Sequence, residues 1–372
     1  MKTILVTGAS GFIGKNLCSR LELINDIRIL RFTKENSPDE LQDYISQADF
    51  IYHLAGVNRP IDDREFKQGN YELTQLIIDT LRRQNKTTPI LISSSTQATQ
   101  QNPYGESKLA AERALLSWQE ESGSMVYIYR LPGIFGKWCR PNYNSVVANF
   151  CYNTANGLPI TINDPGKIIT IAYIDDVIDQ FISHINHPQA SSEILEIQKT
   201  FELSLQELSS RIDELHKTRK TLTIPNLNDL LNKYLYATYT SYLPEDQFSY
   251  QLKKNVDQRG WLAEFIKSES FGQIFISKTQ PGITRGDHWH ATKIEKFLVV
   301  QGHGEIKFRD KNDEKNTVIT YQVNGNDMQV VDIPVGYVHS ISNVGKTELI
   351  TLFWASEILD KDNPDTFYEK VN

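Results

Sequence analysis

The sequence predicts two domains, a doubly wound α/β domain over residues 1–243 and an all-β domain, a sandwich or small barrel, over residues 244–372. Two observations predict the first domain: short apolar runs alternate with helical patterns, and a glycine-rich turn follows the opening run. One observation predicts the second, a change near Pro244 to short β-rich runs with glycine-containing turns. A chain of 372 residues is long enough for two such domains.

The elements of the first domain can be read in order. Strands are expected at residues 3–7, 27–32, 49–54, 90–94 and 126–130, and helices from residue 12, over 73–83 and over 104–121. Apolar strands separated by helices are typical of a parallel sheet covered on both faces. Residues 194–243 are helical in pattern and more polar. Beyond them, runs such as GQIFIS, EKFLVVQGHGEIKF and ELITLFWA predict the strands of the second domain.

Composition excludes several classes of function. The net charge is -7 and no block of basic residues occurs, so nucleic acid is not an expected partner. No apolar run approaches the length of a membrane span, and the run before Gly8 is too short for a signal-peptide core. Cys18, Cys139 and Cys151 have no metal-ligand spacing and indicate incidental thiols. We therefore expect a cytoplasmic protein.

A glycine-rich turn follows the first expected strand. Gly8, Gly11 and Gly14 lie in TGASGFIG, at the start of a helical pattern. Glycine permits a tight turn and lets the backbone approach a pyrophosphate, whose charge is met by the amides and dipole of the helix amino terminus. The pattern predicts a dinucleotide site, and the alternative is a simple glycine-rich turn.

The end of the second strand indicates which dinucleotide binds. An NAD-selective site usually has an acidic residue there to hold the ribose hydroxyls, but LRFTKE carries Arg31 and Lys34. A cation suits a 2'-phosphate, so we expect NADPH. The alternative is that Arg31 is a solvated side chain at a strand end.

Tyr104 and Lys108, in YGESK, stand one helical turn apart on the same face of an expected helix. A tyrosine that donates a proton near neutral pH needs its pKa lowered from about 10, and a neighbouring cation favours the phenolate. Upstream, Ser93, Ser94 and Ser95 end a central strand, where a hydroxyl can bond a substrate carbonyl. Together these residues predict a carbonyl reductase site.

These segments resemble the extended short-chain dehydrogenase/reductase family, which has the Rossmann fold, over residues 1–243. The matching pieces are TGASGFIG, DFIYHLAG, GNYELTQ with Asn70, SSST, YGESK, RLPGIFG and IDDV. The resemblance implies that Tyr104 is the general acid, Lys108 its pKa-lowering partner and Ser95 the carbonyl-binding hydroxyl, with the choice among the three serines open. It also implies that Asn70 supports the helix that carries Tyr104 and Lys108. It implies cofactor contacts from Gly8, Gly11, Phe12, Ile13, Gly14, Arg31, Leu54, Ala55, Gly56, Tyr104 and Lys108.

The same family binds sugar nucleotides through the region after RLPGIFG, here KWCRPNYNSVVANF. Arg140, Asn142 and Asn144 are the expected substrate contacts, because guanidinium and amide groups suit diphosphate and uridine oxygens. The alternative is a polar surface loop.

A second constellation lies in the expected all-β domain. His288 and His290, in GDHWH, are two residues apart in an expected strand, so both imidazoles point to one face. Glu295 follows after a short turn, and His339 lies on a later strand. Three imidazoles and a carboxylate make a credible ligand set for Zn, Fe or Mn, with zinc preferred.

This pattern resembles the cupin family, a small jelly-roll barrel, over residues 245–372. Gly282, His288, His290, Glu295 and Gly302 match its first motif, and Pro334, Gly336, His339 and Asn343 match the second. Met328 stands where the second motif expects a glycine. TRGDHWH is also similar to the RGxH of metal-free deoxysugar epimerases, in which the histidine is a base. Ligation is preferred for His288 because it uses all four side chains.

The joined domains, with FIYHLAGVNRP, QNPYGESK, GKWCRPNYNSV and DIPVGYVH, resemble bifunctional capsular polysaccharide synthesis enzymes of the UDP-N-acetyl-L-fucosamine pathway. The resemblance implies a homodimer acting on a UDP-linked 4-keto-6-deoxy amino sugar. Its cupin domain epimerises C3 of a UDP-2-acetamido-2,6-dideoxy-4-hexulose. Its reductase domain then uses NADPH to give UDP-N-acetyl-6-deoxy-L-talosamine. The alternatives are an NAD-recycling epimerase or dehydratase with a regulatory cupin domain, and a non-enzymatic ligand-binding protein.

Overall fold

The computed structural model describes residues 1–60, 62–186 and 194–372, and the chain forms two compact units. The first unit comprises Met1–Ile212 and Tyr234–Pro244, and the second comprises Asp213–Lys233 and Glu245–Asn372. Residues 213–233 thus pack with the second unit, and the predicted boundary at residues 243/244 stays a prediction. Helical periodicity gives no sign of this crossing, because helix α8 (Leu205–Thr221) continues through it without interruption.

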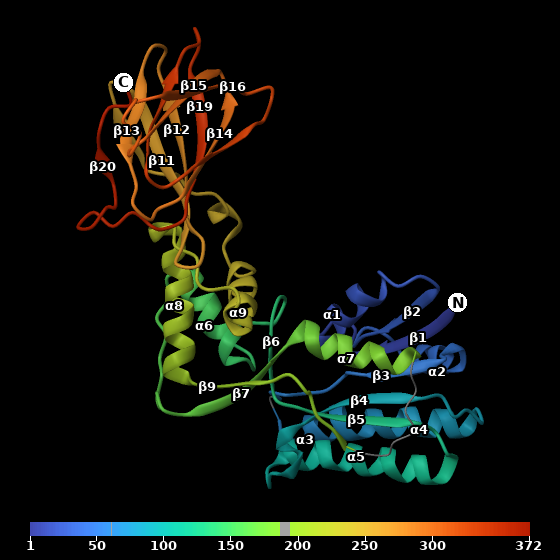
Figure 1. Cartoon of the computed structure of the whole chain (residues 1–372). Coiled ribbons are helices and arrows are strands. Elements are labelled where there is room, and N and C mark those ends of the chain that lie inside the picture. The colour runs from blue at the N-terminus through green and yellow to red at the C-terminus, as the bar shows by residue number, and fades with distance from the viewer. Residues whose placement is uncertain (61, 187–193) are drawn as a thin grey trace. The chain divides into compact units, whose positions relative to one another are not determined.

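The first unit is built on a parallel sheet with strand order β2-β1-β3-β4-β5-β8 (Figure 1). Its strands are β1 (Lys2–Thr7), β2 (Ile27–Phe32), β3 (Phe50–His53), β4 (Ile90–Ser95), β5 (Val126–Leu131) and β8 (Ile194–Leu195). Since β1 lies between β2 and β3, the direction of the crossovers reverses there. The carboxyl ends of β1 and β3 therefore open the crevice in which such sheets bind ligands.

Helices cover both faces of this sheet, as Figure 1 shows. One face carries α1 (Phe12–Leu21) and α7 (Ile174–Asn186), which contact each other, and the other carries α2 (Pro38–Gln47), α4 (Leu73–Arg83) and α5 (Pro103–Ser122). Three short turns lie between these elements: α3 (Arg64–Phe66), the π-helical η1 (Lys67–Glu72) and the 3-10 helix η2 (Thr96–Thr99). This double cover explains why β3 and β4 are buried along their whole length.

Helix α5 has clear sequence signals at both ends. The side chain of Asn102 accepts a hydrogen bond from the backbone nitrogen of Gly105 at 2.8 Å, and Pro103 occupies the first helical position. Gly123 ends the helix with a φ of 69°, a conformation that glycine adopts without strain. The helix that carries Tyr104 and Lys108 is thereby fixed by its own caps.

The remaining elements of the first unit form a smaller layer. They are the sheet β6 (Gly133–Phe135), β7 (Ile168–Tyr173) and β9 (Phe201–Ser204), helix α6 (Val146–Ala155), the first part of α8, and the helix α9 (Leu230–Thr240), which is shared with the second unit. Among the described residues, no helix is both long enough and apolar enough to cross a membrane.

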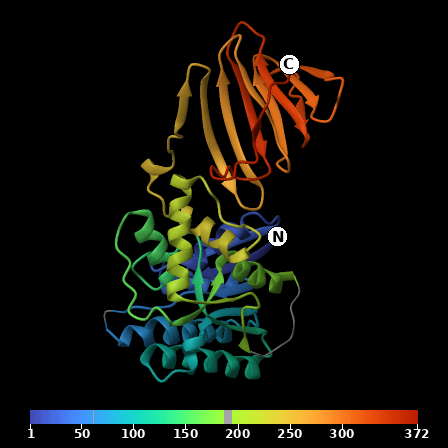
Figure 2. The ribbon, with the colours of Figure 1, turned by 60° about the vertical axis from the view of Figure 1, so that its left-hand side comes forward.

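The second unit contains two antiparallel sheets, seen in Figure 2. One has the order β10-β11-β12-β19-β14-β17 and the other β16-β15-β18-β13-β20. A 3-10 turn η3 (Glu245–Gln247) precedes strands β10 (Lys254–Asp257), β11 (Gly260–Ser268), β12 (Gly272–Thr279), β13 (Thr284–Trp289), β14 (Glu295–Gln301), β15 (His303–Asp310), β16 (Val318–Asn324), β17 (Val330–Ile333), β18 (Tyr337–Asn343), β19 (Leu349–Ala355) and β20 (Phe367–Tyr368). Phe297 and Phe353 of the first sheet pack in one core with Ile306 and Ile341 of the second.

The predicted fold class, a doubly wound parallel domain followed by an all-β unit, is confirmed. Met328, the residue that replaces the expected glycine, has a φ of 48°. The backbone thus keeps the left-handed conformation that a glycine would favour, although this conformation costs more energy for a residue with a side chain.

Candidate active site and candidate metal centre

The glycine-rich turn between β1 and α1 has no room for side chains. A Cβ on Gly8, whose φ is 67°, would lie 2.7 Å from the backbone nitrogen of Ala55, and one on Gly14 would lie 2.2 Å from the carbonyl oxygen of Gly8. Helix α1 begins after Gly11, and in the described part of the chain no side chain caps it. Its first amides are free to meet an anion, so the turn fits a dinucleotide pyrophosphate.

The segment after β3 lies against this turn and against α5, the helix that carries Tyr104 and Lys108. The backbone nitrogens of Leu54 and Ala55 each lie 3.3 Å from an oxygen atom of Thr7, at the end of β1. A Cβ on Gly56 would lie 3.0 Å from Nζ of Lys108. The residues around Gly8, Leu54 to Gly56, and Lys108 therefore come together where the crevice was expected.

Arg31 lies on β2, exposed, and its guanidinium forms an ion pair with the carboxylate of Glu22. The two residues line a surface pocket with Lys15, Ser19 and Trp138. Because the backbone nitrogen of Ala9 bonds the carbonyl of Phe32 at 3.2 Å, the end of β2 lies beside the glycine-rich turn. Arg31 is thus near the expected cofactor site with a competing internal partner.

Lys108 is buried, and its Nζ donates a 3.1 Å hydrogen bond to the backbone carbonyl of Ser93. Burial lowers the pKa of Lys108 to about 8, against the opposing effect of Glu112. Burial also raises the pKa of Tyr104, a rise that a hydrogen-bonding interaction with Ser95 partly offsets. The sequence led us to expect a lowered pKa for Tyr104. The structure differs because burial penalises the phenolate and the ammonium lies 6.0 Å from the ring centroid.

Ser94 and Ser95, neighbours at the end of β4, face different partners, because side chains alternate along a strand. Ser95 interacts with Tyr104 and also accepts a 3.1 Å hydrogen bond from the backbone nitrogen of Gln97. Ser94 points to Glu112, to which its hydroxyl donates a hydrogen bond. The position of Ser95 suits a carbonyl held next to Tyr104, whereas the hydroxyl of Ser94 is engaged by Glu112.

A directed chain of hydrogen bonds passes through His53, a residue to which the sequence assigned no role. The hydroxyl of Thr74 donates to the carbonyl of Asn70 at 2.7 Å, so it must accept the 2.9 Å bond from Nε2 of His53. Nδ1 then accepts from the hydroxyl of Thr7 at 2.8 Å. Burial, with the charge of Lys108, lowers the pKa of His53 to about 3 and keeps the ring neutral.

These hydrogen bonds continue from Asn70 to helix α5. The side-chain amide of Asn70 donates 2.9 Å to the hydroxyl of Ser107, which donates 2.7 Å to the carbonyl of Tyr104. The Asn70 side chain also accepts a hydrogen bond from the backbone nitrogen of Val57 and donates one to its carbonyl oxygen. Asn70 therefore ties the segment after β3 to α5, which is the supporting role that the family resemblance implies. The only local signal for His53 is a polar residue that ends an apolar strand.

The three expected substrate contacts lie in the loop between β6 and α6. Arg140, Asn142 and Asn144 are exposed. The guanidinium of Arg140 lies 5.6 Å from the ring centroid of Tyr143, and the charge of Tyr143 contributes to the raised pKa of Tyr104. Tyr143, a residue of this loop that sequence reasoning missed, is thus close enough to Tyr104 to influence its pKa.

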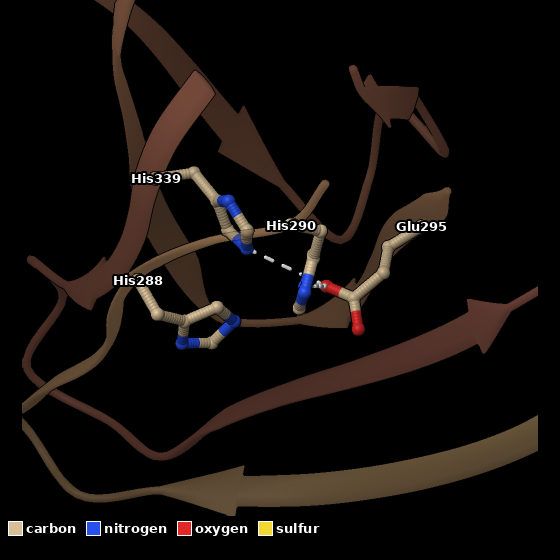
Figure 3. Close-up of side chains that lie close together, drawn as sticks. All are labelled: His288, His290, Glu295 and His339. Atoms are coloured by element: carbon tan, nitrogen blue, oxygen red, sulfur yellow. Dashed lines mark ion pairs between the residues drawn. The ribbon is translucent and has the colours of Figure 1, made fainter. Parts of the chain in front are cut away.

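The four expected metal ligands come from both sheets of the second unit and converge (Figure 3). His288 on β13 lies opposite His339 on β18, Glu295 opens β14, and His290 lies just past the end of β13. Their ligand atoms all lie within 4.8 Å of one another. A bulge at Asp287, with a φ of 56°, interrupts the register directly before His288.

The donor set fits a divalent metal. Nδ1 of His290 donates to the carbonyl of Asp365 at 2.6 Å and Nδ1 of His339 to the carbonyl of Tyr337 at 3.2 Å, which leaves each neutral ring a lone pair on Nε2. Both Nε2 atoms are buried, have no hydrogen-bond partner among the described residues, and lie 3.5 and 3.4 Å from Oε2 of Glu295.

Charge distribution favours the same interpretation. Burial raises the pKa of Glu295, but interactions with His290 and His339, which require protons on the facing nitrogens, outweigh burial and lower the pKa to about 2. A bound cation in place of those protons would keep the carboxylate ionised in the same way. Burial, with a smaller contribution from His339, lowers the pKa of His288 to about 4. An ionised carboxylate beside a neutral imidazole is the protonation state that metal ligands need.

Comparison with known proteins extends these findings. The model of the NAD dependent epimerase/dehydratase family matches residues 4–197, and that of a polysaccharide biosynthesis C-terminal domain matches residues 255–367. The UDP-2-acetamido-2,6-beta-L-arabino-hexul-4-ose reductase of Pseudomonas aeruginosa is 42% identical over 98% of this chain and 97% of its own length.

Solved structures agree with the sequence relatives. The capsular polysaccharide assembling protein CapF from Staphylococcus aureus matches with a TM-score of 0.91 and 46% identity over 99% of both chains. UDP-glucuronic acid 4-epimerase from Bacillus cereus, in complex with NAD, has a TM-score of 0.52 at 19% identity, covers 57% of this chain and 83% of its own, and shows the fold alone. The chain belongs to the NAD dependent epimerase/dehydratase family, among its full-length capsular polysaccharide synthesis members.

Proposed function

We propose that this chain is a bifunctional UDP-sugar enzyme of capsular polysaccharide precursor synthesis. The second unit epimerises C3 of a UDP-2-acetamido-2,6-dideoxy-4-hexulose, and the first unit reduces the C4 ketone with NADPH to UDP-N-acetyl-6-deoxy-L-talosamine. The observation that carries the proposal is the full-length likeness to a protein named as a reductase of a UDP-linked hexul-4-ose. The convergence of Ser95, Tyr104 and Lys108 on one sheet edge supports it.

The first unit supplies the groups that a ketone reduction needs. Bound NADPH would supply the hydride. The hydroxyl of Ser95 holds the C4 oxygen, and Tyr104 donates its phenolic proton to that oxygen as the carbonyl becomes a hydroxyl. Lys108 holds the ribose of the nicotinamide and favours the phenolate that remains. The buried chain through His53 and Asn70 fixes the helix that carries both groups.

The second unit is proposed to hold a divalent metal, preferably zinc, through His288, His290, Glu295 and His339. Such an ion would stabilise the negative charge that develops on the C4 oxygen when the C3 proton is removed. The buried, unpartnered Nε2 atoms of His290 and His339 support this assignment over the metal-free alternative, in which His288 alone acts as base. His288 is the most exposed of the four.

The order of the two reactions follows from their chemistry. Removal of the C3 proton requires the C4 ketone, which acidifies the neighbouring C–H bond and receives the enolate charge. Reduction of C4 destroys that ketone. Epimerisation therefore precedes reduction.

We further propose that the enzyme is a cytoplasmic homodimer. The cytoplasm supplies NADPH and nucleotide sugars, and its reducing conditions suit Cys18, Cys139 and Cys151, which are free and buried. Sedimentation of the purified protein tests the dimer directly, since a monomer at micromolar concentration contradicts it.

One experiment tests the whole assignment. The purified protein is incubated with the 4-keto sugar nucleotide in deuterated water, with and without NADPH, and the products are followed by NMR. We expect deuterium at C3 without NADPH, and a reduced, inverted sugar with stoichiometric NADPH oxidation when it is present. Turnover without net NADPH consumption would instead indicate an NAD-recycling epimerase.

A further inference from the structure

The C-terminal segment of the chain runs along β13, the strand that carries His288 and leads directly into His290, two of the proposed metal ligands. In β20, Tyr368 lies opposite His288 and Phe367 lies opposite Trp289 of β13. We call residues 364–371 the C-terminal strap. The strap lies more than seventy residues after these two ligands in the sequence.

Asp365, within the strap, binds the loop between two ligands. Its carboxylate accepts hydrogen bonds from the backbone nitrogens of Ala291 (2.9 Å), Thr292 (2.9 Å) and Lys293 (2.8 Å), and from the hydroxyl of Thr292 (3.0 Å). These residues connect His290 to Glu295. One carboxylate therefore fixes the whole loop by three successive amides.

The backbone of Asp365 acts on a ligand directly. Its carbonyl oxygen accepts the 2.6 Å hydrogen bond from Nδ1 of His290. A carbonyl oxygen cannot donate, so this contact sets the tautomer of the ring and turns Nε2 towards Glu295. Asp365 has a φ of 36°, an unusual conformation for a non-glycine residue, which the surrounding hydrogen bonds hold in place.

Lys293 adds a buried contact between the loop and the strap. Its side chain is 4% exposed, and Nζ donates to the carbonyl of Pro364 at 2.8 Å and to the hydroxyl of Thr366 at 3.0 Å. A buried ammonium is costly unless it is hydrogen-bonded, so these two bonds stabilise the strap in its docked position against the loop.

The other end of the strap is fixed beside His288. The backbone nitrogens of Glu369 and Val371 donate to the carbonyl and the carboxylate of Asp287, at 3.0 and 3.3 Å. The buried Arg309 donates to the carboxylate of Glu369 at 2.6 Å and to the carbonyl of Val371 at 3.2 Å. The strap therefore contacts the backbone next to His288, through Asp287, and next to His290, through Ala291.

We infer that Asp365 is a positioning residue of the metal centre and that docking of the C-terminal strap and metal binding are thermodynamically coupled. The inference rests on the metal centre of the proposed function. With the strap docked, His290 and the loop before Glu295 are held in the ligating arrangement, so binding does not have to order them. Coupling is reciprocal: if strap docking strengthens metal binding, metal binding stabilises the docked strap by the same factor.

The first test measures metal affinity. Zinc binding to the full chain is determined by competition with a chromophoric chelator for the wild type, Asp365→Ala, Asp365→Asn and Asp362→Ala. Asp365→Ala should bind zinc about 10- to 100-fold more weakly, the usual effect of losing a contact that orients a ligand. Asp365→Asn retains one acceptor oxygen and should recover part of this loss. Asp362, an exposed residue just before the strap, is the matched control and should change nothing.

The second test uses the wild type alone, so it stands even if Asp365→Ala fails to fold. Hydrogen exchange at the amides of Glu369 and Val371 is compared between the zinc-loaded and the chelated protein. Exchange should accelerate on chelation, while amides of α5 in the first unit keep their rates.

The outcomes separate the two proposals. If the wild type binds no zinc, the proposed metal centre itself is rejected. If the wild type binds zinc and Asp365→Ala binds it with equal affinity, the coupling is rejected and the metal centre stands. The same holds if hydrogen exchange in the strap does not change on zinc removal.

Discussion

The hydroxyl of Ser94 donates a hydrogen bond to the buried carboxylate of Glu112, which also forms an ion pair of 2.6 Å with Arg130. Ser94 is therefore committed to a structural network on the far side of β4. Ser95, the next residue, faces Tyr104. The alternation of a single strand thus separates a structural serine from a proposed catalytic one.

Replacement of either serine should give opposite results. Ser95→Ala should lower kcat for ketone reduction by roughly 10²-fold, because a hydrogen bond to the developing oxyanion is lost. Its unfolding free energy should fall by only about 1 kcal/mol, from the lost hydrogen bond to Gln97. Ser94→Ala should retain kcat and lower the free energy of unfolding by about 1–3 kcal/mol, because a buried carboxylate loses a donor. Steady-state kinetics and urea unfolding of both variants give the answer, and a catalytic defect in Ser94→Ala alone would reverse the assignment.

Tyr104→Phe removes the proposed proton donor and keeps the ring. NADPH oxidation should fall by 10²-fold or more, about the scale for a lost general acid. Exchange of the C3 proton should persist, because it depends on the second unit. Unchanged reduction would reject Tyr104 as the acid.

Arg31→Asp should shift cofactor preference from NADPH towards NADH, because a carboxylate repels the 2'-phosphate and suits ribose hydroxyls. Arg28→Asp is the matched control, since Arg28 is an exposed arginine on the same strand and undergoes the same change of charge. The ratio of kcat/KM for the two cofactors is measured in each variant. If Arg28→Asp moves this ratio as much as Arg31→Asp, general charge rather than a specific contact decides the preference.

The pKa of Lys108 predicts two pH dependences of opposite sign. Burial lowers this pKa to about 8, so the ammonium is lost as the pH rises through that value and kcat/KM for reduction should fall. Stability should rise with pH between about 8 and about 10.4, the ordinary lysine value, because there only the unfolded chain binds the proton. Urea unfolding at several pH values checks the second effect, which should be absent in Lys108→Met.

His290→Ala or His339→Ala should abolish stoichiometric metal and destabilise the second unit, because binding free energy is partly folding free energy. C3 exchange should fall, while NADPH binding by the first unit survives. His303→Ala is the control, since His303 is an exposed histidine of β15 outside the cluster. A wild type free of Zn, Fe and Mn with full C3 exchange would return His288 to the role of base.

Much of the fold and of both sites could be predicted because their signals are local. The strand and helix periods predicted the bounds of most elements of the parallel sheet and its covering helices to within a residue or two, and the bounds of helix α4 (Leu73–Arg83) were predicted without error. Gly8, Gly11 and Gly14 follow from the sterics of one turn, and Tyr104 and Lys108 from one turn of helix. The four proposed metal ligands follow the spacing of the two cupin motifs, and the structure brings them together.

Only the tertiary structure decided the features that depend on distant segments. The assignment of residues 213–233 to the second unit, the neutral His53, the raised pKa of Tyr104 and the binding of Asp365 to the loop after His290 have no local pattern. The physical reason is the same in each case. Periodicity, capping and turn sterics act over a few residues, whereas burial and long-range hydrogen bonds exist only after the chain has closed upon itself.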